Sequence, residues 1–325
     1  MNSNSEKFEE YISKSQPSID KYEFKRIKYK KCPHNTIYIF IFFVFILLSL
    51  LFIILQIRND LRIEQKKKIN NTNNITIDWE KEKLVIHALG IFNNYTYTNS
   101  FEALNYWYFQ KKMHLMEADF YLTSDNHIVL SHDFSHMRKT PNLTEFKQSH
   151  SKGNLTSMTF EDLVVFMEKH QDLYIITDTK FKDIPRIKLE FDDMAEILSH
   201  HKNVNERFII QVYNEKMFLF LNENKYPFKL FIFTLYQRWN GRDYKDLENI
   251  FSFCAKHKLK GIVVHKKLFN NKIYNLSNIY SIPIYLHTEN SIIKIAEYLQ
   301  KVKGVYTDEI NNNALEEYLS NQTKL

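Results

Sequence analysis

The sequence predicts a parallel eight-stranded (β/α)8 TIM barrel, an α/β fold, preceded by one N-terminal transmembrane helix. Three observations lead to this prediction. A long apolar run lies near the N-terminus, eight short apolar runs recur later in the chain, and helical patterns separate most of those short runs. Strands that alternate with helices favour a parallel sheet. The length of residues 81–325 also suits a barrel, which takes roughly 250 residues.

The long apolar run covers residues 36–57 and can cross a bilayer as a helix. A cleaved signal peptide is the alternative, but the run starts deep in the chain and no small-residue cleavage site follows it. Basic clusters at residues 25–31 and 66–68 flank the run, which suits anionic lipid headgroups. The slight excess of basic residues before the run favours an extracytoplasmic C-terminal domain.

We therefore expect a cytoplasmic basic tail over residues 1–35, a membrane helix over 36–57, a polar linker over 58–80 and the barrel over 81–325. The net charge of +6 gathers around the apolar run. No basic face with interleaved aromatic residues recurs elsewhere, so we expect no nucleic-acid partner. Two cysteines exclude a disulfide framework and a cysteine-based zinc site.

The predicted strands are short and apolar, and most end in a polar residue. They are Leu84–His87, Leu115–Tyr121, Leu173–Asp178, Phe208–Gln211, Leu230–Thr234, Gly261–Val264, Pro283–His287 and Gly304–Tyr306. The clearest helical patterns are Glu161–Glu168, Met194–His200, Leu247–His257 and Ser291–Val302.

Ionisable side chains recur where these strands end, and in such barrels the chemistry lies at the carboxyl ends of strands. The groups are His87 after the first strand, Glu117 and Asp119 in the second, His132 after an extended run over Ile128–Ser131, and Asp178 with Lys180 after the third. Each has an ordinary interpretation: a structural histidine, a solvated strand face, or a helix N-cap. Their coincidence at neighbouring strand ends favours a common site.

Three acidic groups among them indicate a metal site. Glu117 and Asp119 share one strand face because strand side chains alternate with period two. Buried carboxylates are unfavourable unless something compensates their charge. Together with Asp178 they offer the oxygen ligands that Ca²⁺ or Mg²⁺ prefers.

The chain resembles the glycerophosphodiester phosphodiesterases, within the wider group of phosphatidylinositol phospholipase C-like barrels, in a divergent bacterial-type branch. The resemblance covers about residues 84–310. The segments that carry it are Ile86–Gly90, Thr98–Ala103, Met116–Asp119, Leu122–Asp125, Leu130–Asp133, Tyr174–Lys180 and Gly304–Asp308. The order and spacing of Glu-x-Asp, Thr-x-Asp and His-Asp are the specific part.

The resemblance implies roles for these residues. His87 and His132 match the family's two catalytic histidines, which serve as general acid and base. Glu117 and Asp119 match its Glu-x-Asp metal ligands, and Asp178 stands where a glutamate usually provides the third ligand. The remaining expected contacts to the phosphate or the pocket are Lys180, Asn99, Gln211, Tyr236 and His287.

Two departures from the family pattern concern the substrate. Ala88 replaces the arginine that follows the first histidine, and Thr98 replaces an acid next to Asn99. We expect a metal-dependent phosphodiesterase that acts on a glycerophosphodiester or a related lipid-headgroup or envelope phosphodiester. The alternatives are a catalytically silent, membrane-tethered binding module and a lyase that stops at a cyclic phosphate.

Overall fold

The computed structural model describes residues 44, 46–58, 78–135, 137–235 and 244–322. The chain divides into two units, residues 1–71 and 72–325. In the first unit, residues 46–58 are helical. Among the described residues, no helix has both the length and the apolar character that a membrane crossing requires. Of the predicted segments, the tail over 1–35, residues 36–43 and 45 of the membrane helix, and linker residues 59–77 lie outside this description.

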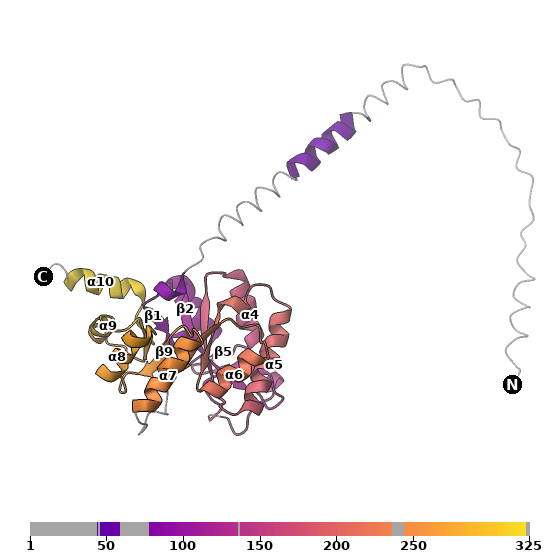
Figure 1. Ribbon diagram of the computed structural model, residues 1–325. Coiled ribbons are helices and arrows are strands. Elements are labelled where there is room, and N and C mark those ends of the chain that lie inside the picture. Colours follow the sequence, from indigo (N-terminus) through magenta and orange to yellow (C-terminus); the bar gives the residue numbers. More distant parts are fainter. Residues whose placement is uncertain (1–43, 45, 59–77, 136, 236–243, 323–325) are drawn as a thin grey trace, which may run out of the picture. The chain divides into compact units, whose positions relative to one another are not determined.

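The second unit is a closed parallel barrel, which confirms the barrel part of the predicted fold (Figure 1). Strand β1 pairs with both β11 and β2, so the sheet returns to its first strand. All eight predicted strands are present, with ends shifted by at most one residue. They are β1 (Leu84–Ile86), β2 (Leu115–Leu122), β6 (Tyr174–Thr179), β7 (Phe208–Val212), β8 (Leu230–Thr234), β9 (Ile262–His265), β10 (Ile284–His287) and β11 (Gly304–Thr307).

An insertion between β2 and the next barrel strand extends one edge of the mouth. The run predicted as extended forms β3 (Ile128–Leu130), which pairs antiparallel with β2. A short helix, α3 (Leu143–Gln148), and a hairpin of β4 (His150–Ser151) and β5 (Leu155–Thr156) follow it. Together these elements carry the loop on which His132 lies.

Helices surround the barrel (Figure 1). They are α2 (Phe101–Asn105), α4 (Phe160–Lys169), α5 (Ile184–Ser199), α6 (Glu215–Glu223), α7 (Tyr244–Lys256), α8 (Asn271–Tyr280), α9 (Ile292–Tyr298) and α10 (Asn312–Gln322). The predicted Met194–His200 segment is only the second half of α5. Asp183 caps this helix and Pro185 lies in its first turn, so the helix begins ten residues earlier, at Ile184.

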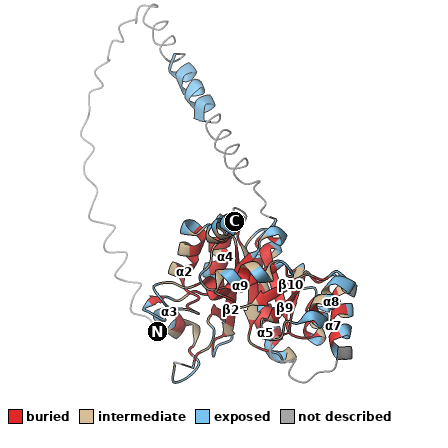
Figure 2. Ribbon diagram, turned by 90° about the vertical axis from the view of Figure 1, so that its left-hand side faces the viewer, coloured by how far each residue is buried: buried red, intermediate tan, exposed pale blue. Residues whose placement is uncertain are grey.

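Two apolar cores flank the strands, and Figure 2 shows the buried segments concentrated there. The outer core lies between strands and helices and includes Ile86, Met116 and Ile175. The inner core fills the barrel. It consists of Trp79, Val85, Leu115, Ile176, Ile209, Ile232, Val263, Tyr285 and Tyr306. Because strand side chains alternate, residues two positions beyond this inner layer face the barrel mouth.

Candidate active site

The polar side chains at the mouth continue the inner face of the barrel. Each lies two residues beyond an inner-core residue, or four in the longer strands. The set is His87 after Val85, Glu117 and Asp119 after Leu115, Asp178 and Lys180 after Ile176, Gln211 after Ile209, His265 after Val263, His287 after Tyr285 and Asp308 after Tyr306. The alternation that builds the core therefore also gathers the candidate site.

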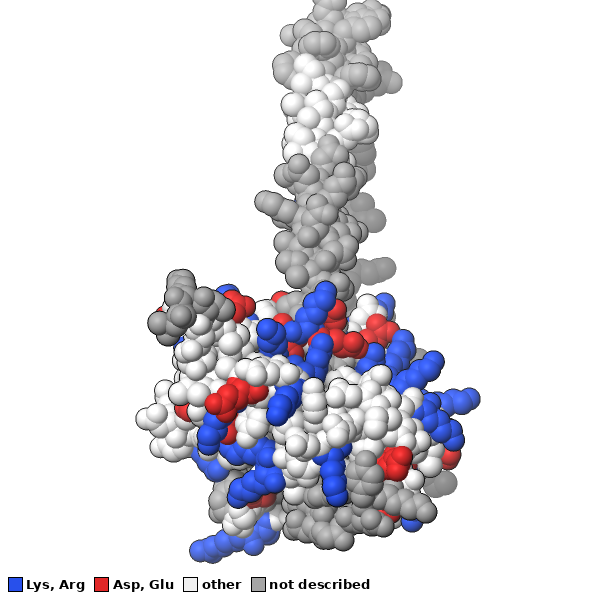
Figure 3. All heavy atoms as spheres, turned by 60° about the vertical axis from the view of Figure 1, so that its left-hand side comes forward, with Lys and Arg blue, Asp and Glu red and all other residues white. Residues whose placement is uncertain are grey.

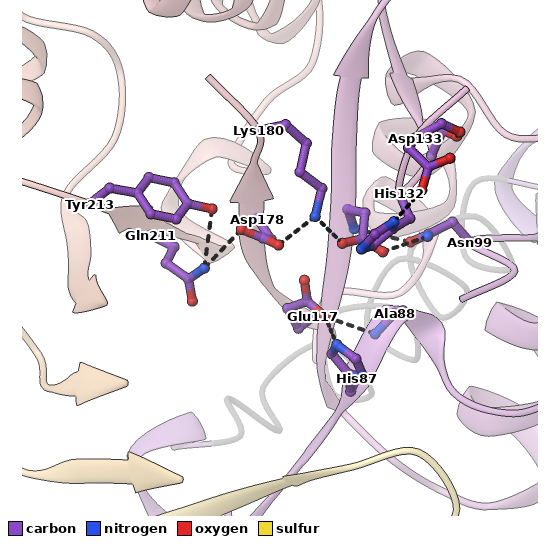
Figure 4. Close-up of polar contacts among 12 residues, drawn as sticks. His87, Ala88, Asn99, Glu117, His132, Asp133, Asp178, Lys180, Gln211 and Tyr213 are labelled. Carbon is purple, nitrogen blue, oxygen red and sulfur yellow. Dashed lines mark hydrogen bonds and ion pairs between the residues drawn. The ribbon is translucent and has the colours of Figure 1, made fainter. Parts of the chain in front are cut away.

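Three carboxylates converge between strands β2 and β6. Glu117, Asp119 and Asp178 each offer an oxygen within 4.8 Å of the others. Asp119 and Asp178 are register partners across the two strands. The ammonium of Lys180 lies 2.5 Å from Asp119 Oδ1 and 2.6 Å from Asp178 Oδ2 (Figure 4). One lysine therefore compensates only part of the negative charge of the triad.

Two buried amides hold the carboxylates in place. Asn99 donates its Nδ2–H to Asp119 Oδ2 at 2.8 Å and accepts the backbone N–H of Asp119 at 3.0 Å. Gln211 donates its Nε2–H to Asp178 Oδ1 at 3.1 Å. Asn99 and Gln211 were predicted to contact the phosphate or the pocket. In the structure each bonds to a carboxylate of the triad, and neither is among the residues that line the cavity.

Burial acts strongly on the triad. It raises the pKa of Glu117 to about 8, with the charge of Asp119 adding to the effect. The pKa of Asp178 is also raised, mainly by burial. Burial alone would raise the pKa of Asp119, but Lys180 and His87 outweigh it and lower that pKa. The fold thus holds more acidic groups here than it can neutralise, which fits a site for a divalent cation.

The backbone after β1 turns sharply around the first histidine. Ala88, Leu89 and Gly90 have φ angles of 48°, 59° and 83°, so three consecutive residues are left-handed. This turn aims the backbone N–H of Ala88 at Glu117 Oε2, at 2.7 Å. Position 88, which lacks the family's arginine, therefore contacts the triad through its backbone.

His87 is buried and oriented by a distant aspartate. Its Nδ1 lies 2.7 Å from Asp308 Oδ1, and its Nε2 lies 3.9 Å from Glu117 Oε2. Asn290 donates to the other oxygen of Asp308 at 2.7 Å. Burial works to lower the pKa of His87, but the hydrogen bond to Asp308 and the charges of Glu117 and Asp119 raise it to about 9.

His132 lies across the mouth and is exposed. Its Nδ1 lies 2.7 Å from Asp133 Oδ2, and the side chain of His132 is 48% exposed. Between the two histidines lies Tyr97, whose ring centroid is 4.9 Å from that of His87 and 5.2 Å from that of His132. The ring of Tyr97 thus contacts both the buried and the exposed histidine.

A cavity of about 540 Å³ connects these groups. Six predicted site residues line it: His87, Asp119, His132, Asp178, Lys180 and His287. Glu117 is buried behind the cavity wall, with 2% of its surface exposed. Tyr236 lies outside the described residues.

Several residues of the site were not predicted as site residues, and Asp308 and Tyr97 are the two that contact the catalytic histidines. Asp308 belongs to a quoted motif, but only the closure of β11 on β1 shows that it contacts His87. Tyr97 precedes the motif that contains Asn99 and gives no signal of its own. The tyrosine could have been found only from the spacing of the β1–α2 loop.

Comparison with known proteins supports the fold. Neither a model of a known protein family nor a curated protein sequence matches the chain. Among solved structures, a glycerophosphodiester phosphodiesterase from Parabacteroides distasonis is similar over 75% of this chain and 98% of its own, with a TM-score of 0.60 and 16% identity. A putative glycerophosphoryl diester phosphodiesterase from Silicibacter pomeroyi is similar over 74% of this chain and 94% of its own, at TM-score 0.60 and 11% identity.

A third similar structure contains a ligand. It is a phosphodiesterase from Oleispira antarctica in complex with the product sn-glycerol-3-phosphate, with a TM-score of 0.54 and 15% identity. It covers 74% of this chain and 97% of its own. The predicted resemblance is thus confirmed in three dimensions: this chain has the fold of the glycerophosphodiester phosphodiesterases.

Proposed function

We propose that the chain is a membrane-anchored, metal-dependent phosphodiesterase that hydrolyses a glycerophosphodiester or a related lipid-headgroup or envelope phosphodiester. One observation carries the proposal. Two histidines, each with Nδ1 bonded to an aspartate, line the same cavity as Asp119, Asp178 and Lys180. The similar solved structures support it, and one of them contains a glycerol phosphate.

Glu117, Asp119 and Asp178 would hold the metal, Ca²⁺ or Mg²⁺. When bound, a divalent cation supplies charge neutralisation and Lewis acidity at a phosphoryl oxygen. Lys180 lines the same cavity, and its ammonium would add to the stabilisation of negative charge on the phosphate. A phosphodiester carries one negative charge, and charge on its reacting oxygens grows as the bond to the leaving group breaks.

The two histidines divide the proton transfers between them. The Nδ1 contacts to Asp308 and Asp133 leave each Nε2 available for the reaction. We assign His132 as the base that takes a proton from the attacking water. His87 is the acid that gives a proton to the leaving oxygen, since Asp308 favours its imidazolium form. A P–O bond to water forms, and the P–O bond to the alcohol breaks.

Turnover of defined diesters tests this proposal. The purified full chain is incubated with a panel of glycerophosphodiesters, with Ca²⁺ or Mg²⁺ and with a chelator, and the products are identified by mass. Hydrolysis adds one water to the diester, whereas a lyase leaves a cyclic phosphate without it. No turnover of any diester by metal-loaded protein contradicts the proposal and favours the silent binding module, for which the missing arginine at Ala88 is the supporting observation.

The anchor is a separate part of the proposal. The apolar run over residues 36–57 and its basic flanks support a single membrane pass, with the barrel on the extracytoplasmic side. Carbonate extraction of membranes tests the anchor, because only an integral protein stays in the pellet. Protease added to intact cells tests the side. Protection of the barrel in intact cells, with digestion after lysis, contradicts the proposed orientation.

A further inference from the structure

The side chain of Tyr97 lies between the two proposed catalytic histidines and lines the same cavity. Its ring centroid is 4.9 Å from that of His87, at an interplanar angle of 86°, and 5.2 Å from that of His132, at 70°. In the proposed reaction the attacking and the leaving oxygen lie on opposite sides of the phosphorus, each next to one histidine. A phosphoryl group held between the histidines therefore lies beside Tyr97.

The loop that carries Tyr97 is fixed to the acidic triad. Asn99, two residues later, bonds to Asp119 at 2.8 and 3.0 Å. Tyr97 itself has a φ angle of 57°, in the left-handed region, which is unfavourable for a residue with a side chain. Such conformations cluster at functional sites, where the surrounding structure maintains them.

The hairpin of β4 and β5 also contacts the Tyr97 ring. The ammonium of Lys152, in the turn of the hairpin, lies 5.6 Å from the centre of the ring. Thr156 donates its backbone N–H and its hydroxyl to the carboxylate of Glu102 at 2.9 and 2.7 Å, which ties the hairpin to α2. The fold therefore sets the position of the ring before a substrate binds.

The hydroxyl of Tyr97 is available to a ligand and keeps its proton. Within the described residues, the direct contacts of this side chain are made by its ring. Burial raises the pKa of the phenol above its usual value of about 10, and three carboxylates of the site add to this effect. They are Asp308, Asp119 and Glu117. The phenol thus stays a hydrogen-bond donor at the pH at which histidines transfer protons.

Positive charge alone does not single out a phosphate contact on this protein. Figure 3 shows Lys and Arg side chains spread over the face of the barrel that it presents. Inside the cavity, Lys180 is paired with Asp119 and Asp178, on the side of the acidic triad. A phosphodiester has two non-bridging oxygens. Contacts on the triad side serve one of them, and the other needs a donor elsewhere in the cavity.

From this geometry we infer that Tyr97 is a further catalytic residue, whose hydroxyl donates a hydrogen bond to the non-bridging phosphoryl oxygen that points away from the acidic triad. This inference rests on the proposed function and adds a substrate contact to it. A neutral donor directed at an anionic oxygen stabilises the bound diester and the charge that develops during displacement.

Binding of a phosphomonoester tests this contact without requiring turnover. The full chain with Mg²⁺ is titrated calorimetrically with sn-glycerol 3-phosphate. Tyr97→Phe keeps the ring between the histidines and removes only the hydroxyl, and we expect it to weaken binding about tenfold. Tyr95→Phe is the matched control, because Tyr95 is 45% exposed and does not line the cavity. Its affinity should equal that of the wild-type chain.

Phosphorothioate diesters assign the contact to one oxygen. In each diastereomer, sulfur, a weak hydrogen-bond acceptor, replaces one of the two non-bridging oxygens. Tyr97→Phe should lower kcat/KM for the all-oxygen diester about 10- to 100-fold. We expect a similar loss for the diastereomer whose sulfur faces the triad, and almost none for the one whose sulfur faces Tyr97.

Unchanged affinity of Tyr97→Phe for sn-glycerol 3-phosphate overturns the inference, as does an equal loss in Tyr95→Phe or an equal loss of kcat/KM for the two diastereomers. If no diester is turned over but the tenfold loss of affinity holds, the proposed hydrolysis fails and the phosphoryl contact stands. If the wild-type chain hydrolyses diesters and Tyr97→Phe is fully active, the hydrolysis stands and this inference fails.

Discussion

The two histidine–aspartate pairs at the mouth have the same contact and opposite surroundings. In both, Nδ1 lies 2.7 Å from an aspartate oxygen. His87 and Asp308 are 5% and 13% exposed, whereas His132 and Asp133 are 48% and 43% exposed. The partner of His87 lies 221 residues away, directly after the last strand, but that of His132 is the next residue.

The two pairs depend on the fold in different ways. The His87 pair exists only when β11 closes the barrel against β1, so the fold holds one half of the site rigidly. The His132 pair is local and lies on the loop after β3. The buried side, around His87, holds acidic charges that Lys180 compensates only in part. The exposed side, around His132, holds few charged groups. Substitutions on the two sides should therefore have different effects.

The largest expected effect is loss of either histidine. His87→Gln and His132→Gln should each lower kcat by about 10³-fold, because each removes a proton-transfer group. His127→Gln is the matched control, since His127 also contacts an aspartate, Asp193, at 3.3 Å but does not line the cavity. Steady-state kinetics on one diester measures all three. Full activity of His132→Gln would show that the exposed histidine takes no part in proton transfer.

Substitution of the two aspartates should affect the two histidine–aspartate pairs to different extents. Asp308→Asn should lower kcat by about 10- to 100-fold and shift the pH profile, because it removes the charge that orients and protonates a buried imidazole. Asp133→Asn should have a smaller effect, about threefold, because solvent competes for an exposed contact. Equal losses in the two variants, measured across pH, would show that burial does not distinguish the pairs.

A pair of glycines tests the rigidity of each side. Gly90 has φ of 83°, and an added Cβ would lie 2.1 Å from Trp107 Nε1, a buried indole bonded to Ile91 O at 3.0 Å. Gly153 has φ of 75°, and its Cβ would meet the half-exposed ring of Tyr95. Gly90→Ala should lower the free energy of unfolding by about 3 kcal/mol and Gly153→Ala by about 1 kcal/mol. Chemical denaturation measures both, and a reversed order contradicts the account.

Metal should change the titration of the buried histidine. In metal-free protein the imidazole of His87 should titrate near its raised pKa of about 9. A bound cation offsets Glu117 and Asp119, so this pKa should fall by about one unit on metal addition. The raised pKa also stabilises the metal-free fold at low pH, an effect that is lost as pH rises from 6.5 through 9. NMR of the ring protons of His87 measures the titration midpoint with and without metal. A midpoint that does not change on metal addition contradicts the prediction.

The smallest expected effect concerns Glu190 on α5, outside the barrel near Asp178. Within the described residues, neither of its carboxylate oxygens has a hydrogen-bond partner, and burial raises its pKa well above the usual value. The charged form is therefore disfavoured, and stability falls as pH rises above about 4.3. Glu190→Gln should add about 1 kcal/mol more at pH 8 than at pH 5. Glu196→Gln, exposed on the same helix, is the control.

The barrel and its inner face were predictable because they follow from local pattern. Short apolar runs separated by helical patterns identified the strands, and period-two alternation placed Glu117 and Asp119 on one strand face. The start of α5 was not predictable from apolar periodicity, because its first turns are set by Asp183 and Pro185. Asp308 and Tyr97 became part of the site only through contacts between distant segments.

The roles of Asn99 and Gln211 show the same limit. Their positions were predicted, but a sequence does not show whether an amide at a strand end faces the ligand or a carboxylate. Here both amides bond to the acidic triad. The resemblance to a known family identified these residues as part of the site. Their hydrogen-bond partners became known only from the closed barrel.

A joint titration of metal binding and turnover tests the central claim most directly. Metal-stripped full chain is titrated with Ca²⁺ or Mg²⁺ while calorimetry reports occupancy and phosphorus NMR reports cleavage of a glycerophosphodiester. The account predicts one tight site per chain, turnover that rises in proportion to its occupancy, and loss of both in Asp178→Ala. Turnover that is undiminished in the stripped chain, or unaffected by Asp178→Ala, would contradict a metal-dependent phosphodiesterase at this triad.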